Sequence, residues 1–263
     1  MRMILLFLMP LCVFATVHYA KTEPYESIKV KSAVSGLVLD VALDKEGTMV
    51  HNESVVHIDD RLDKANLEAS KKSIALLEQM LDINKEIAKS LKNTLERQES
   101  YYHRINTLAT ASKTQKDTAF SAFSSAKTQY LGTKEKIVNL EKQILNLQYK
   151  ITQLEDTISK KTLFLHDTYL YKLAVRKGDF VAPGSVVAQV MDMHKAKLVI
   201  FLDSEELKDI EQKSIYIEGK KTAYHLDKIW KVADEKFISS YRAEIYIEAP
   251  KDIFSTLLKV EIK

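Results

Sequence analysis

Two long stretches of the chain carry apolar residues at alternating spacings of three and four. In the second stretch these positions are unbroken: Ile137, Leu140, Ile144, Leu147, Ile151, Leu154 and Ile158. In the first stretch the same spacing starts at Ile74 and ends at Ile105, with Asn84 and Gln98 as polar interruptions. A repeat of this kind places one apolar seam along each helix and predicts that the two helices pair along their seams.

A run of small and polar residues at 109–114 separates the two patterns, and Ser112 within it has a side chain suited to cap a helix N-terminus. The sequence therefore predicts an antiparallel hairpin over residues 61–161 with its tip near 109–114. Arms of about 45 residues reach on the order of 70 Å at 1.5 Å per residue. A compact domain of this size does not need such a length, so we interpret the hairpin as an element for reaching a distant partner.

The segments on either side of the hairpin repeat each other. Residues 47–56 read Gly-Thr-Met-Val-His-Asn-Glu-Ser-Val-Val, and residues 178–187 read Gly-Asp-Phe-Val-Ala-Pro-Gly-Ser-Val-Val. Glycine at a tight turn followed by alternating apolar residues predicts strand, turn and strand in each copy. Neither copy has enough strands to bury a core by itself, so we expect the two to form one β sandwich together.

Alternating apolar and polar residues continue beyond position 196. They occupy 214–218, 223–230 and 241–248, and a last strand-like run precedes Lys263. Period-two alternation predicts antiparallel strands with one buried face. We expect residues 196–263 to form a small antiparallel β-barrel.

The order of these parts resembles the periplasmic adaptor proteins, also called membrane fusion proteins or HlyD-like proteins. Residues 34–38, Val-Ser-Gly-Leu-Val, and 45–50, Lys-Glu-Gly-Thr-Met-Val, look like the first half of their split biotinyl/lipoyl-like domain. Residues 170–193, with the motif at 175–184, look like the second half, and 197–210 look like the opening strand and short helix of their barrel. The resemblance implies an elongated α+β protein: a lipoyl-like β sandwich (27–60 and 162–193) interrupted by a coiled-coil α-hairpin, then the barrel.

Four glycines fit structural roles in this arrangement: Gly36, Gly47, Gly178 and Gly184. In true lipoyl domains the modified lysine lies at the turn between the halves, where this chain has about a hundred residues of hairpin. A carrier function is therefore disfavoured, and the sandwich is interpreted as a module that packs against its copies in a ring.

In the family the hairpin tip contacts an outer-membrane channel through an arginine, a leucine four residues later and a serine or threonine seven residues after that. Arg104 and Leu108 match the first two positions. The third position is Gln115, and Ser112 arrives three residues early. The resemblance implies a contact through Arg104, Leu108 and Ser112, with a tip about one turn shorter; a merely solvated Arg104 is the alternative.

The resemblance implies an adaptor subunit of a tripartite efflux pump, with no enzymatic activity and no cofactor. Its partners would be an inner-membrane transporter of the RND type, an outer-membrane channel and further copies in a trimeric or hexameric ring, and its cargo heavy-metal cations or drugs. One alternative is the adaptor of an ABC-type exporter or type I secretion system. Another is a periplasmic coiled-coil scaffold without a transport role.

The N-terminus indicates the compartment. Met1 and Arg2 precede an apolar run to Val17, with Ala15 and Ala20 as candidate cleavage residues. Residues 1–20 are therefore predicted to be a secretory signal peptide, with an uncleaved anchor as the alternative. We expect a periplasmic protein associated with the inner membrane, and removal of Cys12, the single cysteine, suits an oxidising compartment.

Composition and charge exclude some classes. The chain has 39 basic and 36 acidic residues, a net charge of +3, mixed throughout, so no basic patch predicts nucleic-acid binding. Its seven histidines are scattered and no catalytic motif occurs. One cluster, Met191, Met193 and His194, has ligands that suit a soft metal ion, although two core methionines at a strand end explain the same residues.

Overall fold

The computed structural model describes residues 16–237, 239–251 and 253–263. The chain forms two compact units. One unit is the hairpin, residues 58–162, and the other combines residues up to 57 with residues from 163 to the C-terminus. Among the described residues, no helix combines the length and the apolar character needed to cross a membrane.

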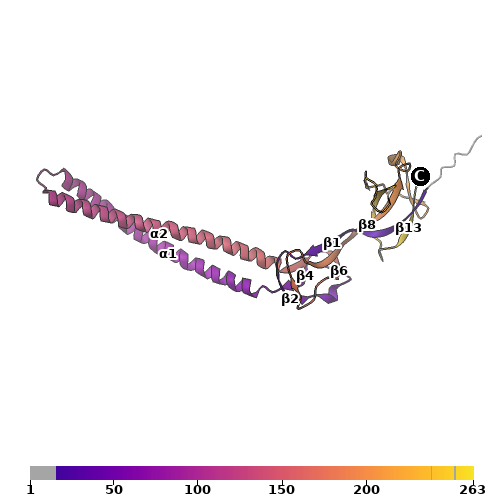
Figure 1. Ribbon diagram of the computed structural model, residues 1–263, viewed down its shortest axis with the longest axis horizontal. Coiled ribbons are helices and arrows are strands. Elements are labelled where there is room, and N and C mark those ends of the chain that lie inside the picture. The colour runs from indigo at the N-terminus through magenta and orange to yellow at the C-terminus, as the bar shows by residue number, and fades with distance from the viewer. Residues whose placement is uncertain (1–15, 238, 252) are drawn as a thin grey trace, which may run out of the picture. The chain divides into compact units, whose positions relative to one another are not determined.

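The hairpin consists of two long helices that lie side by side (Figure 1). Helix α1 covers Arg61–Thr107 and α2 covers Lys113–Lys160, 47 and 48 residues. Every seam position predicted from the heptads is buried or half-buried, including Asn84, whose side-chain amide donates to Met80 O of the previous turn (2.7 Å). The heptad pattern therefore determines which face of each helix meets the other.

The lipoyl-like part of the second unit is a sandwich of two sheets. One sheet has the order β5-β4-β2-β7, built from Thr162–Leu165, Glu53–Ile58, Gly36–Val41 and Phe180–Val181. The other contains β3 (Thr48–Val50), β6 (Thr168–Leu173) and parts of β1 (Thr16–Lys31) and β8 (Val186–Asp203). The short 3-10 helix η1, Leu43–Lys45, precedes β3. The side chains buried in this part are Val38, Val50, Val55, Val56, Leu165, Leu170, Leu173, Val175, Val181, Val187, Ala188 and Val190.

The two sequence repeats exchange strands. β3, which follows Gly47, pairs with β6 of the second half, and β7, which follows Gly178, pairs with β2 of the first half. Both glycines have positive φ, +78° and +95°, and their amides donate to Leu170 O (2.8 Å) and Val38 O (2.9 Å). Each half thus supplies hydrogen-bond partners that the other half lacks, which explains why neither closes alone.

The C-terminal strands form the predicted barrel-like sheet around one apolar core. Its order is β10-β9-β13-β1-β8-β12-β11, with antiparallel pairs throughout. The strands not yet given are β9 (Ile215–Ile217), β10 (Lys220–Lys221), β11 (Lys228–Ile229), β12 (Ser240–Glu248) and β13 (Leu257–Ile262), with the 3-10 helix η2 at Ile210–Gln212. The core residues are Ala20, Leu198, Ile200, Leu202, Ile215, Ala243, Ile245, Val260 and Ile262. The fold class predicted from the sequence is confirmed.

Two long strands differ from the expected boundaries. β8 runs without a break through residues 194 and 195, where the sequence analysis separates the sandwich from the barrel. β1 likewise extends from the sandwich back to Thr16, and its residues 16–21 pair with β13. The buried positions named here have the same parity in both parts of β8, Ala188 and Val190 in the sandwich and Ala196 and Leu198 in the barrel, so one strand serves both cores.

The proposed signal peptide falls on both sides of the start of β1. Residues 1–15 lie outside the described residues, whereas residues 16–20 form the first part of β1. Ala20, one of the two candidate cleavage residues, is buried in the barrel core. Cleavage after Ala20 would remove five residues of a paired strand, so the structure favours Ala15 of the two candidates.

Candidate functional site

The tip of the hairpin is a tight, capped turn. α1 ends at Thr107, and the amide of Leu108 donates back to Ile105 O (3.3 Å). α2 begins after Ser112, whose hydroxyl accepts from the amide of Gln115 (3.3 Å) while Gln115 Oε1 accepts from the amide of Ser112 (2.8 Å). This reciprocal pair is a capping box, so Ser112 is the N-cap that the sequence predicts.

Gln115, the residue at the third tip position that the resemblance implies, is a member of the capping box. Gln115, which takes that position, has its side chain and its amide engaged with Ser112. Leu108 remains 49% exposed, a large apolar side chain without cover at the end of the hairpin. The tip therefore presents an apolar side chain on a backbone that the capping box holds in place.

Aromatic rings hold the two helices together just below the tip. Tyr102 of α1 stacks on Phe123 of α2 with ring centroids 5.7 Å apart and also contacts Phe120 at 5.6 Å. Such pairs add about 0.5–1.5 kcal/mol beyond the area that they bury. The turn is thus supported by a packed layer directly beneath it, which suits a rigid contact surface.

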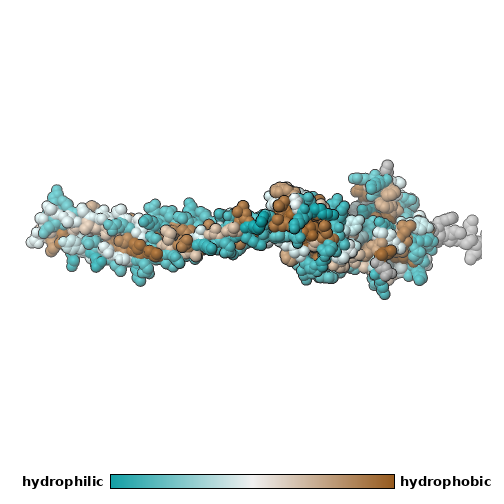
Figure 2. Space-filling model, turned by 90° about the horizontal axis from the view of Figure 1, so that it is seen from below, coloured by the Kyte–Doolittle hydropathy of each residue, from teal (hydrophilic) through white to brown (hydrophobic). Residues whose placement is uncertain are grey.

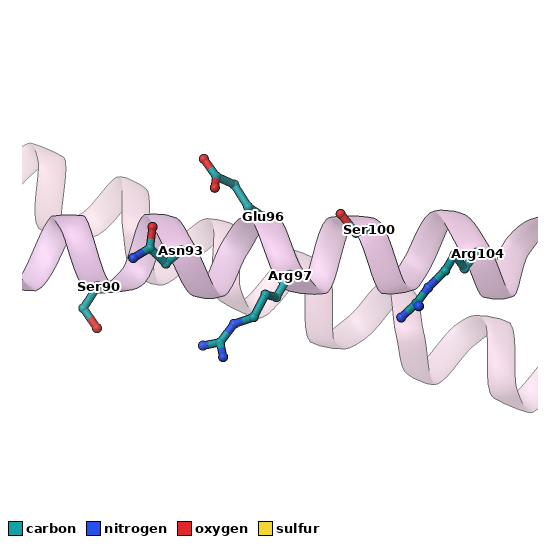
Figure 3. Close-up of a pocket in the computed structure, with 6 residues that line it drawn as sticks. All are labelled: Ser90, Asn93, Glu96, Arg97, Ser100 and Arg104. Atoms are coloured by element: carbon teal, nitrogen blue, oxygen red, sulfur yellow. The ribbon is translucent and has the colours of Figure 1, made fainter.

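Arg104 lies on an exposed polar face of α1. Figure 3 shows its side chain on the same helix as Ser90, Asn93, Arg97 and the other residues that line a shallow groove of about 890 Å³. Its guanidinium makes no ion pair or hydrogen bond recorded among the described residues, whereas Arg97 contacts Thr94 Oγ1 (3.4 Å). The structure places Arg104, Leu108 and Ser112 within the last turn of α1 and the adjoining loop, and all three are exposed.

Further from the tip, each helix carries a second apolar stripe outside the seam. On α1 the stripe is Leu76, Met80, Ile83 and Ile87; on α2 it is Leu131, Val138 and Leu145. These side chains are 45% to 66% exposed. Figure 2 shows hydrophobic side chains on the surface of the hairpin among hydrophilic ones.

The two stripes lie at similar heights on opposite faces of the hairpin. The ion pair of Lys71 with Glu155 (3.0 Å) and the stack of Tyr102 on Phe123 set the register, which brings the α1 stripe level with residues of α2 near 138–150, a range that includes Val138 and Leu145. Each residue of the α1 stripe comes one position before a seam residue in the sequence. Each residue of the α2 stripe comes one position after a seam residue. One position corresponds to a rotation of about 100° about the helix axis. Because the helices are antiparallel and the two offsets have opposite sign, the two stripes face opposite sides of the plane through both helix axes.

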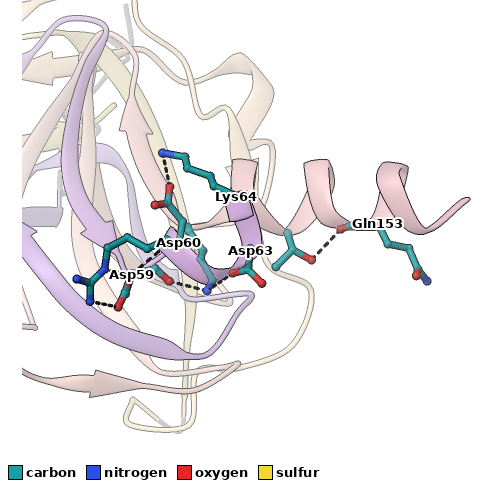
Figure 4. Close-up of polar contacts among 8 residues, drawn as sticks. Asp59, Asp60, Asp63, Lys64 and Gln153 are labelled. Atoms are coloured by element: carbon teal, nitrogen blue, oxygen red, sulfur yellow. Dashed lines mark hydrogen bonds and ion pairs between the residues drawn. The ribbon is translucent and has the colours of Figure 1, made fainter. Parts of the chain in front are cut away.

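A polar clamp closes the base of the hairpin (Figure 4). Lys161 Nζ donates to Asp59 O (2.6 Å) and pairs with Asp63 Oδ2 (2.5 Å), and its backbone carbonyl accepts from the amide of Ile58 (2.8 Å). Lys64 pairs with the buried Asp60 (2.9 Å). Hydrogen bonds from Arg61 hold the pKa of the Asp59 carboxyl well below its usual range. The clamp joins the chain entering the hairpin to the chain leaving it.

Little in the amino-acid sequence marks this clamp. Its only local signal is a cluster of acidic residues at the start of a helix, at 59, 60 and 63, which the helix dipole favours in any case. The decisive partner, Lys161, lies about a hundred positions further along the chain.

The structure separates the three predicted metal ligands. Met191 and Met193 both line a cavity of about 700 Å³ together with Tyr169 and Tyr171, as strand alternation predicts for residues two apart. His194 has the opposite parity on β8, and its Nδ1 lies 2.8 Å from Asp192 Oδ1. Period-two geometry therefore keeps the imidazole away from the two thioethers.

The glycines behave as structural residues. Gly47, Gly178 and Gly184 have φ of +78°, +95° and +90°, in the region that other residues rarely adopt. Gly36 is the first residue of β2. A Cβ at Gly178 or Gly184 would meet nothing within 4 Å, so the backbone conformation, not space, accounts for the residue.

No family model and no curated protein match the sequence. Among solved structures, MacA from Actinobacillus actinomycetemcomitans superposes with a TM-score of 0.74 and 15% identity, over 95% of this chain and 78% of that chain. The chain has the fold of the membrane fusion proteins.

Two further structures with the membrane fusion fold extend the match. A MacA-MexA chimeric protein with the Pseudomonas aeruginosa MexA α-hairpin domain gives a TM-score of 0.62 at 14% identity, covering 95% of this chain and 80% of that chain. The membrane fusion protein Spr0693 from Streptococcus pneumoniae R6 gives 0.57 at 11% identity, covering 94% and 97%. Hairpin, sandwich and barrel are thus all included in the likeness.

Proposed function

We propose that the chain is the periplasmic adaptor of a tripartite efflux pump, linking an inner-membrane transporter of the RND type to an outer-membrane channel. The observation that carries the proposal is the hairpin: two helices of 47 and 48 residues that end in an exposed, capped tip. A helix of this length spans about 70 Å. The membrane fusion fold of the whole chain supports the same role.

In this proposal the tip contacts the channel through Arg104, Leu108 and the Ser112 turn. Leu108 offers an apolar side chain, and Arg104 offers a guanidinium with five donors, none of them paired within the part of the chain that the structure describes. Arginine is enriched among the residues that contribute most of the binding energy at protein interfaces, and an exposed apolar side chain beside it is surface that a partner can bury. The role is mechanical, and the proposal assigns the chain no catalytic step.

In this proposal the ring contact lies on the two apolar stripes of the hairpin and not on the lipoyl-like sandwich, to which the resemblance assigns it. Because the α1 and α2 stripes lie on opposite faces, the α1 stripe of one copy meets the α2 stripe of the next. Such head-to-tail contacts form a ring when the rotation from one copy to the next closes, whereas a two-fold dimer pairs one patch with itself. A trimer or a hexamer satisfies this rule.

Residues 1–15 act as an export signal, with cleavage after Ala15, and the mature protein works at the periplasmic side of the inner membrane. The intact mass of the protein recovered from the periplasm tests this. A mature chain that begins at Thr16 is expected, because β1 is then complete. A chain that begins at Lys21 would contradict the cleavage site, and one that keeps residues 1–15 would replace the signal with an anchor.

Purification of a C-terminally tagged chain from cross-linked membranes, followed by mass spectrometry, tests the adaptor function. Recovery of an inner-membrane transporter and an outer-membrane channel is expected, and the transporter identifies the pump class and its cargo, metal cations or drugs. Recovery of an ATP-driven transporter would instead identify the chain as the adaptor of an ABC-type exporter or type I secretion system. Recovery of the chain alone would favour the coiled-coil scaffold and overturn the proposal.

A double variant and a control test the contact of the hairpin tip with the outer-membrane channel. Arg104→Glu with Leu108→Ala is expected to lower recovery of the channel at least tenfold and leave recovery of the transporter unchanged. Arg97→Glu makes the same charge change about 10 Å further down α1 and serves as the control. Equal losses in both variants would remove the tip from the contact.

The ring is tested by two stripe variants, Ile83→Lys with Ile87→Lys on α1 and Val138→Lys with Leu145→Lys on α2. Each variant alone is expected to be monomeric by light scattering. In a mixture, the α1 variant keeps an intact α2 stripe and the α2 variant keeps an intact α1 stripe. These two stripes can pair once, so the mixture should form dimers and no larger assembly. A variant of one stripe that still assembles fully would contradict the head-to-tail arrangement.

A further inference from the structure

The cavity that Met191 and Met193 line lies beside the point where β1 and β8 pass from the sandwich into the barrel. Its volume is about 700 Å³, within the range of pockets that hold small organic molecules. Most of its lining residues belong to β1, β6, β8 and the segment before β13. Figure 1 shows β1, β6 and β8 next to one another, in agreement with their pairing.

Strand register places the floor of the cavity on one face of the sheet. Met191 of β8 lies opposite Tyr169 of β6 on one side and opposite Ser27 of β1 on the other. Met193 follows two positions later on β8 and shares this face. Val190, of opposite parity, is buried in the sandwich, so the cavity is on the outer face. Aromatic rings and polarizable thioethers on such a floor pack well against a flat ring system.

The segment before β13 forms one wall of the cavity and is held in place by β1. Ile253, Phe254 and Ser255 belong to this wall. The amide of Ser255 donates to Thr22 O (2.8 Å), and the amide of Thr22 donates to Thr256 O (2.9 Å). Ile253 is 72% exposed even so. Backbone hydrogen bonds therefore fix the wall before a ligand arrives, which lowers the entropic cost of binding.

Three ionisable side chains line the cavity, and together they leave one positive charge. Lys21 and Lys197 carry ammonium groups, and Glu23 carries a carboxylate. Glu23 lies opposite Lys197 in the register of β1 with β8, so these two charges offset each other. Lys21 lies opposite the apolar Leu257 of β13. The balance favours a ligand with one negative charge.

Lys197 is the better placed of the two cations for binding an anion. Its side chain is 19% exposed, and its Nζ lies 3.9 Å from Glu244 Oε1, beyond hydrogen-bond distance. Glu244 Oε1 accepts instead from Arg242 Nη2 at 2.8 Å. A partly buried ammonium whose carboxylate partner is this distant gains more from an anion than a fully hydrated one does.

We propose that this cavity binds a small amphipathic organic anion, with a flat apolar body and one carboxylate or sulfonate. The body packs on the rings of Tyr169 and Tyr171 and on the thioethers of Met191 and Met193, and the anionic group reaches Lys197. In this site the two methionines are apolar contacts and not metal ligands. The proposal does not depend on the adaptor function, because it rests only on the cavity.

Fluorescence titration of the purified full chain with anilinonaphthalene sulfonate tests the site. This probe is an aromatic anion whose emission rises in apolar surroundings. N-phenylnaphthylamine has the same rings without the sulfonate, and ethidium is an aromatic cation. One tight site per chain is expected for the sulfonate, with at least tenfold higher affinity than for the other two probes. Binding of the sulfonate without a tight site, or equal or tighter binding of ethidium, would overturn the proposal.

Three variants test whether the probe binds in the cavity. Lys197→Met keeps the apolar stem and removes the charge, so it is expected to weaken binding of the sulfonate at least tenfold and to change binding of N-phenylnaphthylamine less than twofold. Tyr171→Ala removes a ring that is 51% exposed and should weaken binding of both probes. Lys195→Met, at an exposed position of β8 that does not line the cavity, is the matched control.

Thermal unfolding midpoints close to that of the unmodified chain show that each variant is folded. Equal losses of sulfonate binding in Lys195→Met and Lys197→Met would mean that the general charge of the surface, and not the cavity, attracts the probe. That result would overturn the proposal, as would a sulfonate affinity that neither Lys197→Met nor Tyr171→Ala lowers.

Discussion

The hairpin and the β unit are stabilised in different ways. The best-buried large side chains of the hairpin seam, Leu140 and Ile144, are still 7% and 8% exposed, whereas Leu170 and Leu198 in the β unit are fully buried. A two-helix hairpin can bury only a stripe, while two facing sheets enclose their side chains on every side. Stability is therefore spread thinly along the hairpin and concentrated in the β cores. The uncovered sides of the hairpin remain free for partners.

The largest expected effect comes from emptying a β core. Leu170→Ala should lower the free energy of unfolding by about 2–5 kcal/mol, because the fully buried side chain leaves a cavity. Leu140→Ala in the seam should cost less, since a half-open stripe relaxes around the loss. Trp230, the single tryptophan, lies in the β unit, so its fluorescence during urea unfolding reports that unit, and ellipticity at 222 nm reports mainly the hairpin. A seam variant that is the more damaging of the two would reverse the comparison.

Two glycines, one in the β unit and one in the hairpin, test how the backbone conformation affects the stability of each unit. Gly47→Ala should destabilise the β unit by about 1–3 kcal/mol, because φ there is +78° and alanine is strained in that region. Gly132→Ala, in the middle of α2 with nothing within 4 Å of the new Cβ, should stabilise the hairpin by about 0.5–1 kcal/mol. Thermal unfolding of the two variants gives shifts of opposite sign. Shifts of the same sign would contradict the turn role of Gly47.

Removal of the capping box is expected to change the free energy of unfolding by a smaller amount. Ser112→Ala should cost about 0.5–2 kcal/mol, since the amide of Gln115 loses its acceptor at the start of α2. Native-state hydrogen exchange should show the change at the tip and leave the amides of the β cores unaffected. Thr152→Ala, an exposed hydroxyl bonded within α2, is the control. Faster exchange throughout the hairpin would mean that the cap supports more than the turn.

The smallest effect is a dependence on pH in the last strand. Hydrogen bonds from Lys259 and Lys263 lower the pKa of Glu261 from 4.5 to about 2. A carboxyl whose pKa is lowered by folding adds stability above pH 4.5, and that contribution is lost as the pH falls from 4.5 towards 2. Glu261→Gln should therefore flatten the fall in unfolding midpoint over this interval. Glu248→Gln, at the exposed end of β12, is the control, and an identical pH profile for both variants would exclude this role of Glu261.

Some features of the candidate site depend on residues close together in the sequence, and others join residues that are far apart in it. Ser112 as the N-cap was predicted from residues 109–114 alone, because a cap depends on neighbours three positions away. The clamp of Lys161 with Asp59 and Asp63 joins residues about a hundred positions apart, and nothing in the local sequence marks it. The grouping of Met191 and Met193 with His194 was drawn from adjacency in sequence, and strand alternation separates them.

The sequence by itself determined the elements whose signal is periodic. Heptads specify the seam of each helix, the loss of the heptad specifies the turn, and the repeat around Gly47 and Gly178 specifies two equivalent β segments. Only the tertiary structure decided which strands pair: that the repeats exchange β3 and β7, and that β1 and β8 each serve two cores. The physical reason is that helix contacts repeat within a few residues, whereas a sheet joins backbone groups regardless of their separation along the chain.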